Sequence, residues 1–174
     1  LHGAVERNDC KMVEDLLRRQ ADPALLDSQN YTPFHIAAIC GSCEAASLLL
    51  STKGGRQLIE ASSTRYGETA LYLAAMNGNV GMMELLVQYG TRIYTRMKQN
   101  RKTVRKKEVL HAAVLFAGSL NGTKKPMEYI LQHKVGTIHM DIVDDMGFAP
   151  IHLAILGGKN DVLDLLLEHG TSVD

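Results

Sequence analysis

The 174 residues of this chain are 45% hydrophobic, 5% aromatic and 22% charged, with 4 Pro and no Trp. This composition excludes a disordered or collagen-like protein and favours a helical core over an all-β sandwich. No apolar run reaches the roughly 18 residues of a membrane-spanning helix, and no charged-then-apolar leader precedes a cleavage site. Three cysteines are too few for a disulfide-stapled scaffold and predict a reducing, intracellular compartment.

One short motif recurs along the chain. It opens the sequence at residues 1–5 and returns at residues 32–38, 69–75, 110–113 and 149–154. The aligned apolar anchors are Leu1, Phe34, Leu71, Leu110 and Ile151, which are 33, 37, 39 and 41 residues apart. This spacing predicts one repeated unit whose loops differ in length.

Each anchor is followed by a second apolar cluster, and each unit is therefore predicted to hold two short antiparallel helices. In the third unit, Met82, Leu85 and Leu86 have the spacing of one helix face. Glycines are predicted to make the turn between the two helices and to end the second helix. The turn glycines are Gly41, Gly78 and Gly158, and the terminal ones are Gly90 and Gly170. Because one such pair cannot bury its apolar face, neighbouring units must stack.

These motifs resemble ankyrin repeats, and residues 144–154 with 166–170 match the family pattern almost throughout. The resemblance implies an all-α solenoid of stacked helix-turn-helix units with hairpin-like fingers. The expected units of this single array are approximately 1–26, 27–63, 64–102, 103–143 and 144–174. The first is truncated and the fourth is irregular, with extra residues before Pro126. Neither end has the polar outer face of a cap, so we expect an excerpt of a longer protein.

Two sets of potential metal ligands are interpreted as structural. The histidines at one repeat position are His2, His35, His111 and His152. Repeated positions in a stack lie about 10 Å apart, beyond the roughly 2 Å of a zinc–nitrogen bond. Each imidazole is therefore predicted to hydrogen-bond backbone near its finger, and no metal or cofactor is predicted.

Cys40 and Cys43 have C-x-x-C spacing, but the other zinc ligands and the strand of a redox motif are missing. They are predicted to be turn residues. Cys43 is expected in the first turn of the second helix, where a lowered thiol pKa would favour oxidation. No catalytic triad, phosphate-binding glycine loop or catalytic carboxylate pair occurs in a matching context. The segment is therefore not expected to be an enzyme.

Residues 91–107 form a strongly basic segment with eight cations and no acid. Removing these 8 from the 19 basic residues leaves 11 against 19 acidic residues elsewhere. The candidate contact residues are Arg101, Lys102, Arg105, Lys106 and Lys107. A solvated loop is one interpretation; an acidic protein, an anionic lipid headgroup, a phosphorylated ligand or a nuclear import receptor is the alternative. Sequence-specific nucleic-acid recognition is disfavoured.

The resemblance also implies where a partner binds, on the concave side formed by fingers and first helices. The predicted contact residues are Gln29, Tyr31, Ile39, Cys40, Arg65, Tyr66, Glu68, Met76, Asn77, Lys107, Leu115, Phe116, Met146, Phe148 and Leu156. Tyr is a common interface anchor and Met makes adaptable apolar contacts. Alternatively, some of these rings pack against the adjacent finger.

The resulting hypothesis is a non-catalytic scaffold that binds a partner protein or peptide. Two alternatives stay open, namely the cytoplasmic ankyrin region of a membrane ion channel and the substrate-recruiting arm of a larger enzyme. The expected location is the cytoplasm, with the nucleus or a membrane-anchored parent protein as alternatives.

Overall fold

The computed structural model describes residues 1–61, 67–91, 109–117, 122–133, 140–144 and 146–170. Within these ranges, ten helices form five antiparallel pairs. The pairs are α1 (His2–Glu6) with α2 (Cys10–Arg18), α3 (Pro33–Cys40) with α4 (Cys43–Leu50), α6 (Ala70–Met76) with α7 (Val80–Gln88), α8 (Val109–Ala117) with α9 (Lys125–Gln132), and α10 (Pro150–Leu156) with α11 (Asn160–Glu168). A further short helix, α5 (Gly55–Ile59), follows the second pair.

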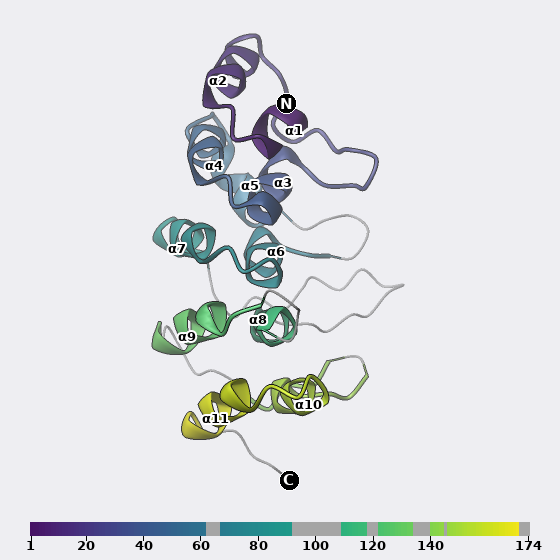
Figure 1. Cartoon of the computed structure of the whole chain (residues 1–174). Helices are drawn as coiled ribbons and strands as arrows, with labels where there is room; N and C mark the ends of the chain where they lie inside the picture. The colour runs from purple at the N-terminus through teal and green to yellow at the C-terminus, as the bar shows by residue number, and fades with distance from the viewer. Residues whose placement is uncertain (62–66, 92–108, 118–121, 134–139, 145, 171–174) are drawn as a thin grey trace.

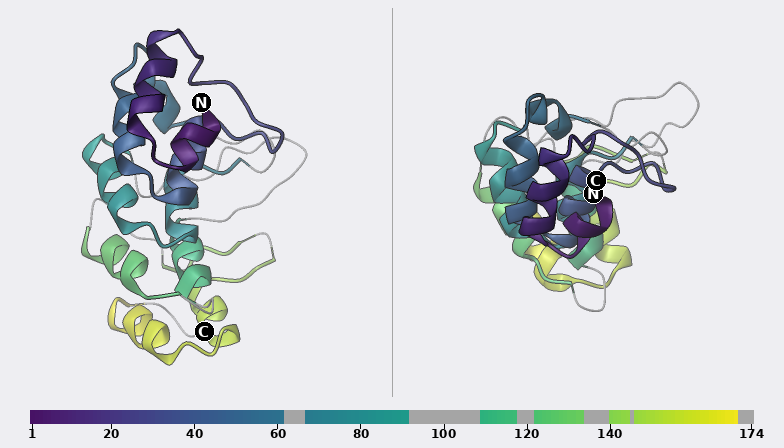
Figure 2. Two further views of the ribbon diagram at one scale, coloured as in Figure 1. Left: turned by 45° about the horizontal axis from the view of Figure 1, so that its top comes forward. Right: turned by 90° about the horizontal axis from the view of Figure 1, so that it is seen from above.

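The pairs stack in chain order. The first helices contact one another in the succession α1, α3, α6, α8 and α10, and the second helices do so in the succession α2, α4, α7 and α9. Figure 1 shows these two sets as two columns, with the first helices on the right. The described loops before α3 and α10 project from the same side of the stack (Figure 2). The predicted all-α stack of helix-turn-helix units is therefore confirmed.

Threonines start two of the first helices. The Oγ1 atoms of Thr32 and Thr69 accept hydrogen bonds from the backbone N–H groups of His35 and Tyr72, both at 3.3 Å. Each bond satisfies one of the backbone donors that a helix N-terminus leaves free. The Thr-Pro and Thr-Ala motifs found in the sequence are thus N-terminal signals of α3 and α6.

The turn between the two helices of a unit requires a left-handed backbone. Gly41 and Gly78 both have φ of +74°, and Gly158 has φ of +63°. In the first unit Asn8 holds the same position with φ of +52°, a conformation that Asn tolerates better than most residues. This confirms the predicted role of the turn glycines.

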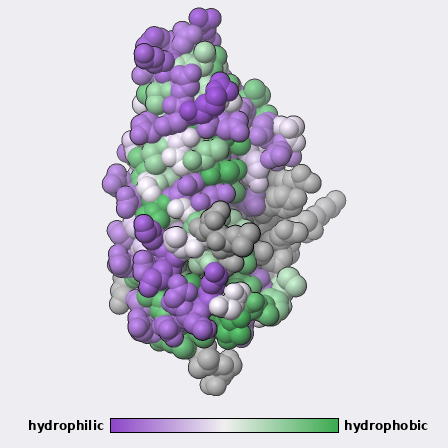
Figure 3. All heavy atoms as spheres, in the orientation of Figure 1, coloured by the Kyte–Doolittle hydropathy of each residue, from purple (hydrophilic) through white to green (hydrophobic). Residues whose placement is uncertain are grey.

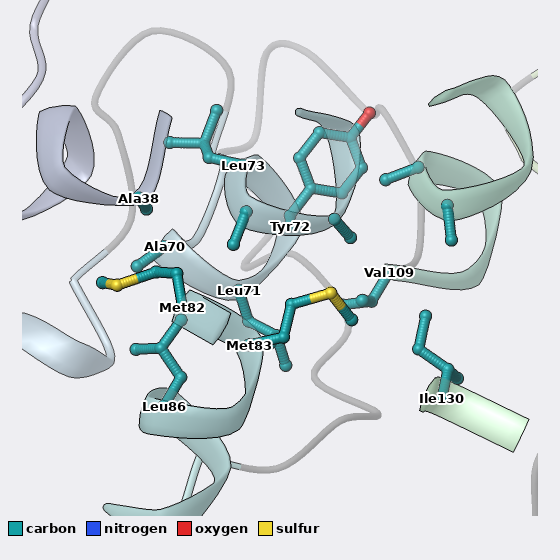
Figure 4. Packing of buried hydrophobic residues seen from close by; sticks show 14 of the residues in the cluster. Ala38, Ala70, Leu71, Tyr72, Leu73, Met82, Met83, Leu86, Val109 and Ile130 are labelled. Atoms are coloured by element: carbon teal, nitrogen blue, oxygen red, sulfur yellow. The ribbon is translucent and has the colours of Figure 1, made fainter. Parts of the chain in front are cut away.

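The buried core lies mainly at the contacts between neighbouring units. The alanines Ala37, Ala38, Ala74, Ala75, Ala112 and Ala113 have no exposed surface, because small side chains let neighbouring first helices approach closely. Figure 4 shows Met83 of α7 pointing toward Val109 of the next unit, while Met82 lies beside Ala70. Both methionines are at most 1% exposed. The apolar surface of each unit is therefore buried largely by its neighbour.

Asparagine side chains add polar links between units. The Nδ2 atom of Asn79 donates to the carbonyls of Ala38 at 2.9 Å and Ile39 at 2.8 Å. These carbonyls lie at the end of α3, where a helix leaves acceptors unsatisfied. Asn79 thus links the third unit to the C-terminal end of α3 in the second unit.

Helix α5 was not anticipated from the sequence. Its side chains Leu58 and Ile59 are 6% and 4% exposed. A Cβ atom on Gly55 would lie 2.6 Å from the carbonyl oxygen of Leu49, so only glycine fits against the end of α4. This insertion lies between the second and third anchors and accounts for part of their longer spacing.

The fourth unit keeps its helix pair despite its longer sequence. Pro126 lies in the first turn of α9, as predicted, where its missing N–H group costs no hydrogen bond. Residues 118–121 of the extra segment lie outside the described residues.

Candidate protein-binding surface

Four of the predicted contact residues share one repeat position on successive first helices. They are Ile39 of α3, Met76 of α6, Leu115 of α8 and Leu156 of α10. Met76 is 39% and Leu156 is 69% exposed, while Ile39 and Leu115 are half-buried. Because the first helices stack in this order, the four side chains form an apolar row along the stack. We call these four residues the first-helix row.

The next position along each first helix is more varied. Cys40 and Asn77 are exposed, and the Nδ2 atom of Asn77 donates to the carbonyl of Leu73 at 2.8 Å. Phe116 is half-buried, and its ring covers Gly78 of the preceding unit so closely that a Cβ atom there would collide with it. Phe116 is therefore partly used for packing between units.

Two described finger tips have the same construction. The Oδ1 atom of Asp27 accepts from the N–H groups of Gln29 at 2.8 Å and Tyr31 at 2.9 Å. In the last finger, Oδ1 of Asp144 accepts from the N–H groups of Met146 and Phe148, both at 2.9 Å. These turns leave Gln29 exposed and Met146 75% exposed. An aspartate thus fixes each tip and presents a neighbouring side chain to solvent.

Two predicted residues from neighbouring fingers contact each other. The hydroxyl of Tyr31 donates to Oε2 of Glu68 at 2.7 Å, and both residues are half-buried. Phe148 is also half-buried, with its ring 6.3 Å from that of His152. The alternative that some rings pack against the adjacent finger therefore describes Tyr31. Phe116 lies instead on the interhelix turn of the preceding unit, and Phe148 lies near His152 of its own unit.

The remaining predicted contacts lie outside the described residues. This applies to Arg65, Tyr66 and the basic residues Arg101, Lys102, Arg105, Lys106 and Lys107. Other exposed apolar side chains were missed by the sequence reasoning. In the first finger Leu25 and Leu26 are 62% and 41% exposed, and their adjacent position in a loop was the available signal. Ile155 of α10 is also 54% exposed, and the sequence reasoning did not consider it.

The histidines at the repeat position bond the backbone as predicted, but in three units the acceptor belongs to the next finger and not to their own. Their Nε2 atoms face the carbonyl oxygens of the next finger at 3.0 Å for His2 with Tyr31, 3.1 Å for His35 with Ala61, and 3.1 Å for His111 with Phe148. A carbonyl only accepts, so each Nε2 carries the proton. In the last unit, Nδ1 of His152 accepts from the N–H group of Ala149 at 2.9 Å.

His35 is the most enclosed of these residues, with no exposed surface. Its Nδ1 atom accepts from the N–H group of Thr32 at 3.2 Å, so the neutral imidazole satisfies both ring nitrogens. Burial lowers the pKa of His35 below 6.5, and this outweighs the opposite effects of the Ala61 and Glu68 carbonyls and of Asp27. The fold therefore favours the uncharged side chain.

The stability of the stack should consequently depend on pH. Because the pKa of His35 is lower in the folded state, its contribution is complete above pH 6.5 and is lost as the pH falls below that value. The loss can reach about 1.4 kcal/mol per pH unit for one proton. Urea unfolding at pH 7.5 and 5.5 measures this loss in the free energy of unfolding. The His35→Gln variant should lose less of that free energy between the two pH values than the unmodified chain. An equal difference in both proteins would contradict this assignment.

The thiol pKa of Cys43 differs from the prediction made from the sequence. Cys43 begins α4 as predicted, but the expectation of a lowered thiol pKa is wrong. Burial, with the nearby carboxylates of Glu44 and Glu84, raises the pKa of Cys43, and burial also raises that of Cys40. Both thiols are therefore poorer nucleophiles than a free cysteine.

Comparison with known families identifies the repeat. A model of three ankyrin-repeat copies matches residues 1–97, and a single ankyrin-repeat model matches residues 146–174. Among described residues, no three His, Cys, Asp or Glu side chains gather as metal ligands. No helix in the described ranges has the length and apolar character needed to cross a membrane.

Three relatives illustrate the range of proteins that share the repeat. Transient receptor potential cation channel subfamily A member 1 of Homo sapiens is 27% identical over 100% of this chain and 15% of its own length. NF-kappa-B inhibitor alpha of Sus scrofa is 37% identical over 52% of this chain and 29% of its own. Putative E3 ubiquitin-protein ligase XBAT31 of Arabidopsis thaliana is 28% identical over 99% of this chain and 38% of its own. The chain thus spans well under half of each relative's length.

Proposed function

We propose that this chain, which belongs to the ankyrin-repeat family, is a non-catalytic module that holds a partner protein or peptide against its fingers and first helices. The observation that carries the proposal is the first-helix row, in which Met76 and Leu156 are 39% and 69% exposed. Apolar side chains that line up along a surface favour contact with another macromolecule. An intracellular location is part of the proposal, since the three cysteines are free.

The exposed finger side chains extend this surface. Met146 stands 75% exposed on a tip fixed by Asp144, and Gln29 is exposed on the equivalent tip fixed by Asp27. The backbone of a turn that is already fixed loses little conformational freedom when a partner binds, which favours affinity. We therefore assign Met146 and Gln29 to the rim of the contact surface and the first-helix row to its centre.

The test replaces Met76 and Leu156 by Lys and measures capture of cellular proteins by the purified chain. A partner that contacts both side chains should bind at least about tenfold more weakly, since loss of 1.4 kcal/mol corresponds to a factor of ten. The matched control places Lys at Gln88 and Gln132, which are exposed on the second helices α7 and α9. Equal weakening by both double variants, or by neither, would contradict the proposed surface.

A second candidate has the same segment acting within a larger protein. The match of this chain to 15% of a cation channel supports an ankyrin region of a channel, and the match to a putative ubiquitin ligase supports the substrate-recruiting arm of an enzyme. The sequence of the whole protein separates these cases. Several apolar spans outside this segment would favour the channel, and a catalytic domain would favour the enzyme.

A further inference from the structure

The first-helix row has a regular period along the stack. Ile39, Met76, Leu115 and Leu156 each lie five residues after the anchor of their unit, and the helices that carry them contact one another in this order. Since stacked units are about 10 Å apart, so are these four side chains. Hydrophobic atoms gather at the level of α10 in Figure 3, and α10 carries Leu156, the last residue of the row. A partner that contacts every unit must therefore offer an apolar group about every 10 Å.

Regular backbone conformations differ in how they match this period. A β-strand advances about 10 Å in three residues, but its side chains alternate between two faces, so every third one points away from the row. An α-helix advances about 10.5 Å in seven residues and returns to the same face within about 20°. Over three intervals this drift is about 60°, within the roughly 100° apolar stripe of an amphipathic helix. A polyproline II helix also matches, because it returns to the same face after about 9.3 Å.

The chemistry of the row separates the α-helix from the polyproline II helix. The isoleucine, methionine and leucine side chains of the row carry no hydrogen-bond donor, and at the next position Asn77 already donates to the carbonyl of Leu73 at 2.8 Å. A polyproline II backbone has no internal hydrogen bonds, so its polar groups would lose water against the row without gaining partners there. An α-helix satisfies its own backbone groups and presents only side chains. The row therefore favours an α-helix.

An acidic residue continues the row at the first unit. Glu6 of α1 lies five residues after Leu1, at the same repeat position, and its side chain is exposed. Because α1 packs on α3, Glu6 precedes Ile39 along the stack. Within the described ranges no Lys or Arg forms an ion pair with Glu6. The neighbouring Arg7 turns back along α1, with Nη1 3.5 Å from the Cβ position of Gly3. A partner cation at this end would therefore meet a complementary charge.

We propose that the partner segment bound here is an amphipathic α-helix that lies along the first-helix row, with an apolar side chain at every seventh position and a Lys or Arg one heptad farther on, opposite Glu6. This inference rests on the proposed function and specifies the kind of partner. The period of the row sets the heptad spacing, the lack of donors favours a helical backbone, and Glu6 sets the charge at one end. Five contacts at this spacing need a helix of about 29 residues.

The spacing of cross-links on the partner tests the helix directly. A benzophenone amino acid replaces Glu6, Met76 or Leu156 in three separate full chains, because all three side chains are exposed. Mass spectrometry of the cross-linked partner then locates the residue attached to each position. Since these positions lie two units apart, the attachment sites should follow one another at intervals of about 14 residues. Intervals of about six residues would indicate a polyproline II segment instead, and attachment to separate segments would contradict a single helix.

A charge exchange tests the end of the helix at Glu6. Glu6→Lys should weaken binding of the cross-linked partner about two- to fivefold, the range for an exposed ion pair. Changing the partner cation nearest the attachment site of position 6 to Glu should restore binding. The matched control, Glu84→Lys on the exposed side of α7, should leave binding unchanged, and equal weakening by both variants would overturn the contact at Glu6.

The outcomes also separate this inference from the proposed function. A partner that cross-links to none of the three positions would contradict the proposed binding surface itself. A partner that cross-links to them at intervals other than about 14 residues would overturn the helix and leave the binding surface in place.

Discussion

Replacing Leu71 by Ala is expected to lower the free energy of unfolding by about 2 to 5 kcal/mol, the range for a Leu-to-Ala change in a packed core. Leu71 is the anchor of the central unit and is 1% exposed. It belongs to the cluster in which Met83 reaches toward the fourth unit (Figure 4). The cavity would therefore weaken contacts within the third unit and with its neighbour. Urea unfolding followed by circular dichroism measures the change.

The matched control removes the same atoms from a residue that the structure exposes. Leu156 is 69% exposed, so Leu156→Ala should change the free energy of unfolding by less than about 0.5 kcal/mol, as for most surface substitutions. The comparison separates the two apolar positions of a first helix, one facing the core and one facing solvent. Similar losses in the two variants would show that the repeat register is wrong.

Gly78→Ala should destabilise the stack by about 2 to 5 kcal/mol. Two effects add: an alanine in the left-handed conformation costs about 1 to 2 kcal/mol, and forcing a neighbour out of a packed position costs about 1 to 3 kcal/mol. The backbone of Gly78 has φ of +74°, and its missing Cβ leaves the space that the ring of Phe116 occupies. Thermal and urea unfolding both report the loss.

A second glycine isolates the contribution of Phe116. Gly158 also has a left-handed backbone, with φ of +63°, but nothing lies within 4 Å of a Cβ atom placed there. Gly158→Ala should therefore cost only the conformational part, about 1 to 2 kcal/mol. Combining Gly78→Ala with Phe116→Ala should give a smaller loss than the two single losses added together. Strict additivity would mean that the ring does not pack on Gly78.

The parts of the fold that could be predicted are those in which one residue type has one physical use. Gly41 and Gly78 make the turns between helices with a positive φ, and the repeated histidines bond the backbone, although the acceptors lie in the next finger and not in their own. Each of these features recurs at a fixed spacing, so the repetition itself reveals it. Helix α5 could not be found in this way because five residues show no periodicity and its glycine acts through contact with Leu49.

The candidate surface was less predictable because it depends on contacts between units. The sequence reasoning grouped Tyr31, Glu68 and Phe116 with Met76 as groove residues. In the structure Tyr31 bonds Glu68 and Phe116 covers Gly78, so these side chains are partly occupied within the stack. Met76 has no such contact with the residues that the structure describes and is 39% exposed. Side-chain type alone does not separate these cases, because an aromatic ring fits an interface and a packing contact equally well.

The most direct test of the proposed function is site-specific photo-cross-linking in cells. A benzophenone amino acid replaces Met76 on the first-helix row, and in a second protein it replaces Gln88, which is exposed on the second helix of the same unit. We predict a discrete cross-linked partner protein from position 76 and none from position 88. A partner cross-linked from position 88 and absent from position 76 would contradict the assignment of binding to the first-helix side.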